Sequence, residues 1–179
     1  MDEPFTDVPT LRRQARENLE QGPITEAYRA DRTRLLAVLN EVLATELVCV
    51  LRYKRHYYMA EGIGSGPVAQ EFLQHAAEEQ GHAEMIAARI VQLQGAPDFN
   101  PATLAERSHA EYAAGRDLVD MIKEDLVAER VAIASYQEII RWIGTNDPTT
   151  RRLLEDILAV EEEHADDLLV LLDEVGRAG

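Results

Sequence analysis

The sequence predicts an all-α protein, a four-helix bundle in which one long crossover connection carries a short helix. Apolar residues recur every three or four positions along most of the chain, which is the spacing of helices with one buried face. Aromatic residues make up only 6% of the chain and β-branched residues do not alternate with polar ones, so strands have little support. Glycine- and proline-rich breaks divide this periodic pattern into four long segments.

The breaks lie at residues 62–67, 95–101 and 144–148. Two of them contain Asn100-Pro101 and Asp147-Pro148, a pattern typical of an N-cap followed by proline at the first helical position. A helix of about 28 residues is about 42 Å long, so four such helices can form a bundle with one long connection. The predicted long helices span residues 31–61, 67–94, 113–143 and 148–175, with the short crossover helix near 101–109.

Residues 1–30 are predicted to be an N-terminal arm with a short helix near 10–20, and residues 31–179 to be the bundle domain. The start of the chain is acidic and has no basic segment followed by an apolar run, so it does not resemble a signal peptide. No apolar run is long enough to span a bilayer. We therefore expect a soluble, cytoplasmic protein without a membrane partner.

The charge of the chain argues against a nucleic-acid partner. There are 33 acidic and 18 basic residues, which give a formal net charge of −15, whereas phosphate binding depends on a high density of Lys and Arg. The arm is not a basic tail either, because its acidic residues outnumber its arginines. The single cysteine, Cys49, excludes an internal disulfide and is expected to be a small core residue.

Each long helix places an ionisable residue on its apolar stripe, near the middle of its length. The first and third helices each place one glutamate there, and the second and fourth each place a Glu-x-x-His motif. The six candidate metal ligands are Glu46, Glu79, His82, Glu129, Glu161 and His164. The candidate catalytic residues are these six together with Tyr53.

The two halves of the chain repeat this arrangement with nearly equal spacing. In each half a tyrosine, Tyr53 or Tyr136, follows the first glutamate by two helical turns. The repeat also decides which glutamate accompanies His82, because Val160 occupies the position in the second half that matches Glu78. Only the Glu-x-x-His pair is therefore common to both halves.

Burial of these groups predicts a di-metal site. One unpaired buried carboxylate costs several kcal/mol, and four in one core would also repel one another. No Lys or Arg lies on these stripes at the same level. Two divalent cations would balance four carboxylates, and two neutral imidazoles would complete the ligand set. Carboxylate-rich ligation with one histidine per metal favours iron or manganese over zinc, in an arrangement known from four-helix bundles.

Other polar residues are expected around this site. Tyr53 and Tyr136 are expected either to hydrogen-bond ligand carboxylates, or to lend an electron, or to be ordinary aromatic core residues. Asp125 and Glu78 are candidate acceptors for the far nitrogens of the two ligand histidines.

Three further histidines and a tryptophan have weaker expectations. His75 is expected at the surface, with a place beside the ligands or along an iron path as the alternative. His56 and His109 are expected to be solvated, and Trp142 to be in packing or at an interface.

Four segments resemble the ligand-bearing segments of bacterioferritins and of their Dps-like relatives with a bacterioferritin-type centre. They are LNEVLATELVCVLRY, AAEEQGHAEMI, VAERVAIASYQEII and ILAVEEEHADDLL. The resemblance covers about residues 35–175 and includes all six ligand positions in order. It implies a ferritin-like bundle and a ferroxidase that oxidises Fe(II) with peroxide or dioxygen. It also implies storage of the ferric mineral in a hollow homo-oligomeric shell and protection against oxidative stress.

The resemblance also implies roles for individual residues. Two glutamates would bridge the two irons, each iron would have one further glutamate and one histidine, and Tyr53 would stand beside the site. In this assignment the first iron is held by Glu46 and His82, the second by Glu129 and His164, and the bridges are Glu79 and Glu161.

Three departures favour the Dps-like relatives. Gln80 stands where bacterioferritins carry the methionine that binds haem, so no haem is expected. The chain stops at Gly179 without the short fifth helix of bacterioferritins, and its crossover is longer than theirs. Dps-type subunits carry a short helix in the crossover that builds a two-fold contact, and here Leu104 would be its main anchor. We therefore expect a homododecamer rather than a 24-subunit shell.

The expected cofactors are two iron ions per chain, which manganese or zinc could replace in a crystal. The alternative function is a di-iron or di-manganese oxidase or catalase that acts on a small substrate. Such enzymes usually need a substrate pocket or a partner subunit, and this chain has no large insertion to build one. A metal-free helical scaffold is disfavoured by the cost of the buried carboxylates.

Overall fold

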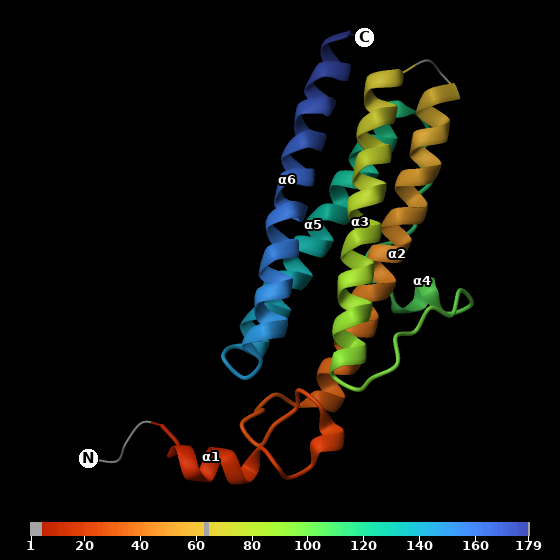
Figure 1. Ribbon diagram of the computed structural model, residues 1–179. Helices are drawn as coiled ribbons and strands as arrows, with labels where there is room; N and C mark the ends of the chain where they lie inside the picture. The colour runs from red at the N-terminus through yellow and green to blue at the C-terminus, as the bar shows by residue number, and fades with distance from the viewer. Residues whose placement is uncertain (1–4, 63–64, 179) are drawn as a thin grey trace.

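The computed structural model describes residues 5–62 and 65–178, and every regular element in these ranges is a helix. Four long helices run side by side along the molecule (Figure 1). The predicted all-α four-helix bundle is therefore confirmed. The long helices are α2 (Arg32–Gly62), α3 (Gly66–Gln92), α5 (Leu118–Ile143) and α6 (Pro148–Ala178).

The bundle consists of two helix pairs, because α2 packs mainly along α3 and α5 mainly along α6. The crossover from α3 to α5 follows residues 93–117 and carries the one-turn helix α4 (Leu104–Arg107), which packs against α2 (Figure 1). Helix α1 (Val8–Gln14) and the last turns of α6 lie at opposite ends of the bundle (Figure 1). Among the described residues, no helix combines the length and the apolar character needed to cross a membrane.

The apolar core is divided into two clusters by a polar layer. On α2, the buried apolar residues from Leu35 to Leu43 belong to one cluster, whereas Cys49, Tyr53 and Ala60 belong to the other. The other three long helices are divided in the same way, and the six candidate ligands lie between the two clusters on every helix. The bundle therefore places the six candidate ligands in one layer across its middle. Cys49 is buried, as predicted.

Helix α5 begins five residues later than predicted. Gly115 adopts a φ of +65°, a left-handed conformation that interrupts a helix, and a Cβ atom there would collide with Met121. The helix begins after Asp117, whose Oδ1 accepts a hydrogen bond from the backbone N–H of Asp120 at 2.9 Å. The other three long helices agree with the prediction to within a few residues.

The short helix predicted near 101–109 is present in the crossover, but it is only one turn long and spans Leu104–Arg107. Asn100 does not cap it; instead its Oδ1 accepts from the backbone N–H of Ala102 at 3.1 Å and closes a turn before Leu104. Leu104 is only half-buried. The connection is held to the bundle by Arg107, whose NH1 donates to the carbonyl oxygen of Asn40 at 3.0 Å.

The second predicted cap is confirmed. The Oδ1 atom of Asp147 accepts from the backbone N–H of Thr150 at 2.9 Å, and Pro148 is the first residue of α6. The same carboxylate accepts from Arg89 NH2 at 2.9 Å and from the hydroxyl of Tyr28 at 3.0 Å. This buried network ties the end of α3 and the arm to the start of α6.

In the arm, the predicted helix near 10–20 is replaced by two shorter elements. Helix α1 spans Val8–Gln14, and a 3-10 turn, η1, spans Leu19–Gln21. Asn18 lies between them, directly before η1, and adopts a left-handed conformation with a φ of 53°. Residues 1–4 of the arm and residues 63–64 of the first predicted break lie outside the described residues.

Candidate metal centre

The structure brings all six candidate ligands together in the polar layer, and each is at most 4% exposed. Their ligand atoms form two groups of four, and within each group all four atoms lie within 4.8 Å of one another. Two glutamates belong to both groups, which is the position that bridging ligands would occupy. The groups are Glu46, Glu79, His82 and Glu161, and Glu79, Glu129, Glu161 and His164.

The two imidazoles face different oxygens of the shared glutamates. His82 Nδ1 lies 2.9 Å from an oxygen of Glu161, 3.4 Å from Glu46 and 3.5 Å from Glu79. His164 Nδ1 lies 3.5 Å from an oxygen of Glu79 and 3.5 Å from one of Glu161. Cations bound at about 2.0–2.2 Å from each ligand atom hold neighbouring ligands at about 3–3.5 Å. The observed separations fit such cations.

Unsatisfied polar atoms in the layer also point to cations. Every one of the six residues has a buried nitrogen or oxygen atom without a hydrogen-bond partner, and both oxygens of Glu161 are in this state. An unsatisfied buried polar group costs about 1–3 kcal/mol. The unpartnered atoms all belong to the facing groups described above, so the residues present fit two divalent cations.

The pKa values in the layer are set by burial and by the charges of the neighbouring carboxylates. Burial raises the pKa of Glu46 to about 8, and the charge of Glu79 adds to this shift. Burial alone would lower the pKa of His82, but the neighbouring carboxylates outweigh it and raise this pKa to about 12. The pKa of His164 is raised in the same way to about 11. The four carboxylates therefore make the layer a strong attractor of positive charge.

Two tyrosines orient the two glutamates that belong to only one group. The hydroxyl of Tyr136 on α5 donates to Glu46 Oε1 on α2 at 2.6 Å, and the hydroxyl of Tyr53 on α2 donates to Glu129 Oε1 on α5. Both tyrosines are buried. In each glutamate the other oxygen is left without a partner and faces the centre. The expectation that these tyrosines hydrogen-bond ligand carboxylates is confirmed.

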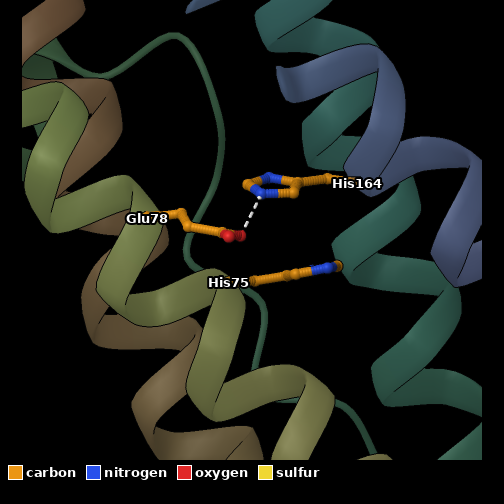
Figure 2. A group of neighbouring side chains, drawn as sticks. All are labelled: His75, Glu78 and His164. Carbon is orange, nitrogen blue, oxygen red and sulfur yellow. Dashed lines mark hydrogen bonds and ion pairs between the residues drawn. The ribbon is translucent and has the colours of Figure 1, made fainter.

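The far nitrogen of one ligand histidine has the predicted acceptor. His164 Nε2 lies 2.8 Å from an oxygen of Glu78, and Figure 2 shows the carboxylate reaching from α3 toward the ring on α6. A proton on Nε2 leaves the Nδ1 lone pair free for the centre. Asp125 does not play the corresponding role for His82, so that part of the prediction was wrong.

Asp125 belongs instead to a buried network that the sequence did not reveal. It accepts from Arg52 Nε at 2.7 Å and lies 2.7 Å from His56 Nδ1. Arg52 also donates to the carbonyl oxygen of Glu111 at 3.0 Å, and His56 Nε2 lies 3.1 Å from that of Ala114. The network holds the crossover against α2 and α5. His56 is fully buried, so the expectation of a solvated residue was wrong.

The surface position expected for His75 is also wrong, because its side chain is 0% exposed. Its ring stacks on that of His164 with centroids 4.0 Å apart, as Figure 2 shows, and its Nδ1 lies 3.3 Å from the hydroxyl of Tyr53. His109 is partly buried, 3.6 Å from Glu41. Trp142 is 47% exposed and does not pack in the core; its interface contact stays a prediction.

A family model described as the ferritin-like domain matches residues 36–178 of this chain. The chain belongs to the ferritin family. Within this family it is of the bacterioferritin type: it is 32% identical over 146 residues to the bacterioferritin of Mycobacterium leprae, covering 81% of this chain and 87% of that one. It is also 27% identical over 153 residues to the bacterioferritin of Rhodobacter capsulatus, covering 82% of this chain and 89% of that one.

Two solved structures of this family are similar to the bundle. One is a bacterioferritin-related protein from Bacteroides fragilis, described as a dodecameric thioferritin, with a TM-score of 0.79, 34% identity, and coverage of 84% of this chain and 90% of that one. The other is the bacterioferritin of Rhodobacter capsulatus, described with a metal-free dinuclear site and a haem iron. It has a TM-score of 0.73, 25% identity, and coverage of 84% and 90%. The predicted resemblance to bacterioferritins is therefore confirmed.

Proposed function

We propose that this protein is a ferroxidase that stores and detoxifies iron in the cytoplasm and so protects against oxidative stress. The observation that carries the proposal is the layer of unpartnered, fully buried carboxylate and imidazole atoms, arranged as two groups with two shared glutamates. The family membership adds support, because the relatives that match most of the chain are bacterioferritins.

The substrate is Fe(II), and two ions bind side by side. The first is held by Glu46 and His82 and the second by Glu129 and His164, while Glu79 and Glu161 bridge them. Each Fe(II) loses one electron, and the pair of electrons reduces peroxide to water or dioxygen to hydrogen peroxide. The four carboxylates balance the four charges of two Fe(II) ions, so binding relieves the repulsion within the layer.

The residues around the ligands have positioning roles. Tyr53 and Tyr136 each hold one oxygen of a glutamate, so that the other oxygen is directed at iron. Glu78 fixes the tautomer of His164 through a contact of 2.8 Å. The apolar clusters on either side of the layer exclude bulk water and strengthen these electrostatic interactions.

Replacement of a bridging glutamate tests the proposal, because it affects both ions. The wild-type chain should bind two Fe(II) ions without oxygen and oxidise them rapidly when peroxide or dioxygen is added. Either Glu79→Ala or Glu161→Ala should lower the initial rate by about a hundredfold or more, because loss of a residue that only supports a metal ligand already costs about 10–100-fold. The matched control is Glu162→Ala, which removes an exposed carboxylate next to Glu161. Wild-type rates in the bridging variants would refute the assignment.

We propose further that the chain assembles as a closed dodecamer. The similar protein from Bacteroides fragilis is described as dodecameric, and the crossover here carries a helix, α4, at the place expected for a two-fold contact. Light scattering tests the size of the particle: twelve chains of 20.1 kDa give about 240 kDa. A particle of twice that mass, or a stable monomer or dimer, would contradict the dodecamer and leave the di-iron assignment intact.

A further inference from the structure

We propose that Glu71, His75 and Asp167 form a third site for a divalent cation, beside the di-iron centre and distinct from it. The three residues come from α3 and α6, and one ligand atom of each lies within 4.8 Å of the other two. None of them belongs to either of the two groups that make up the di-iron centre. The inference therefore goes beyond the proposed function and rests on different residues.

The hydrogen bonds of His75 determine which nitrogen faces this site. The single hydroxyl proton of Tyr53 is donated to Glu129, so the tyrosine oxygen can only accept from His75 Nδ1, which lies 3.3 Å away. In the neutral ring, a proton on Nδ1 leaves Nε2 as a lone pair. His75 Nε2 is therefore an acceptor, and it is buried without any hydrogen-bond partner.

Two carboxylates stand in front of this lone pair. An oxygen of Glu71 lies 3.4 Å from His75 Nε2 and an oxygen of Asp167 lies 3.8 Å from it. Three acceptors directed at one point repel one another unless a positive charge lies between them. Four ligands placed tetrahedrally about 2.1 Å from a cation are about 3.4 Å apart. The observed distances are close to this value, so the trio fits a cation with water as its remaining ligand.

The exposure of the three residues shows which side of the site faces solvent. The side chain of Asp167 is 52% exposed and that of Glu71 30%, whereas His75 is fully buried. The other contacts of His75 are on the side of the di-iron centre, because its ring stacks on His164 and its Nδ1 faces Tyr53. A cation held here would lie between solvent and the di-iron centre.

The test uses Zn(II), which binds the same ligand types and is not oxidised. Crystals of the full chain, stripped of metal and soaked in zinc, should show three anomalous peaks per chain. One of these should lie about 2.0–2.3 Å from His75 Nε2. The double variant Glu71→Gln/Asp167→Asn should lose this peak alone, and in solution its third zinc should bind at least tenfold more weakly. These substitutions keep His75, whose removal would open a cavity beside His164.

The matched control is Glu84→Gln/Asp166→Asn, which removes one exposed carboxylate from each of the same two helices. It should keep all three peaks. A wild-type crystal with zinc at the di-iron centre but none at His75 would overturn the third site and leave the proposed function standing. Zinc at His75 with an empty di-iron centre would support the third site and overturn the proposed function. A third peak that survives in the double variant would also overturn the assignment, because its ligands would be other residues.

Discussion

Removal of Asp125 should be among the most destabilising single changes in the chain. Its carboxylate and the side chain of Arg52 are at most 1% exposed, and the two are joined by a 2.7 Å hydrogen bond. In Asp125→Ala the guanidinium stays buried without its counter-charge, and His56 loses its acceptor as well. Breaking a buried pair by removing one partner costs about 3–5 kcal/mol. For a protein with about 5–15 kcal/mol of total stability, this is a large fraction.

Equilibrium urea denaturation of the metal-stripped chain measures this loss. With an m-value of about 2 kcal/mol/M, a loss of about 4 kcal/mol lowers the midpoint by about 2 M. The variant and the wild type must be compared at equal protein concentration, because assembly contributes to stability. Asp125→Asn is the intermediate case, since it keeps the size of the side chain and removes only the charge.

Glu155→Ala is the matched control, because it differs mainly in burial. Glu155 pairs with Arg151 at the same distance, 2.7 Å, but the two side chains are 43% and 42% exposed. An exposed helical pair of this spacing is worth about 0.3–0.5 kcal/mol. If Asp125→Ala lowered the midpoint no more than Glu155→Ala does, the argument that burial sets the cost of the broken pair would be refuted.

Three further predictions concern metal, pH and haem. Chelation should lower the melting temperature measured by calorimetry. A cation at a hundredfold excess over its Kd adds about 2.7 kcal/mol of stability, which is about 5–10 °C for a chain of this size. An unchanged melting temperature would count against the cation layer. Burial would raise the pKa of Asp147, but hydrogen bonds from Thr150 and Arg89 lower it overall. The stability that Asp147 contributes is therefore fully present above its unfolded pKa near 3.8, and it is lost as the pH falls through the lowered folded pKa. Asp147→Asn should therefore destabilise the chain at pH 7 and flatten the acid limb of urea midpoints measured against pH. The protein should also be isolated without haem, because Gln80 offers no thioether, and a stoichiometric Soret band would contradict this.

The bundle could be predicted from the sequence because its long helices are strongly periodic and end at clear breaks. The short elements could not be predicted in the same way. Their bounds depend on single backbone conformations, such as the left-handed Gly115 before α5 and Asn18 in the arm. At Asn100-Pro101 the sequence offers a helix cap, but the side chain closes a turn instead. The same residue types serve both purposes, and only the surrounding chain decides between them.

The six candidate ligands could be named from the sequence because each lies on an apolar stripe and the pattern occurs twice. Apart from Tyr53 and Tyr136, the surrounding polar residues occur once, so nothing in the chain repeats to mark them. Their burial depends on partners from distant segments: His56 is covered by the crossover, and Arg52 is neutralised from α5. A signal did exist for His75, which lies on the same stripe as Phe72, Ala76 and Glu79. A stripe position should therefore have outweighed the general tendency of histidine to lie at the surface.

The repeated halves explain why the centre needs the whole bundle. In the proposed centre, the pair α2–α3 would supply one terminal glutamate, one histidine and one bridge, and the pair α5–α6 the same set. Each cation would take its second bridge from the opposite pair, and each tyrosine already reaches across to a glutamate of the opposite pair. One pair alone would offer a single cation two carboxylates and an imidazole, with no second bridge to hold its neighbour. The proposed two-cation layer would therefore form only when the pairs dock, and bound cations would oppose their separation.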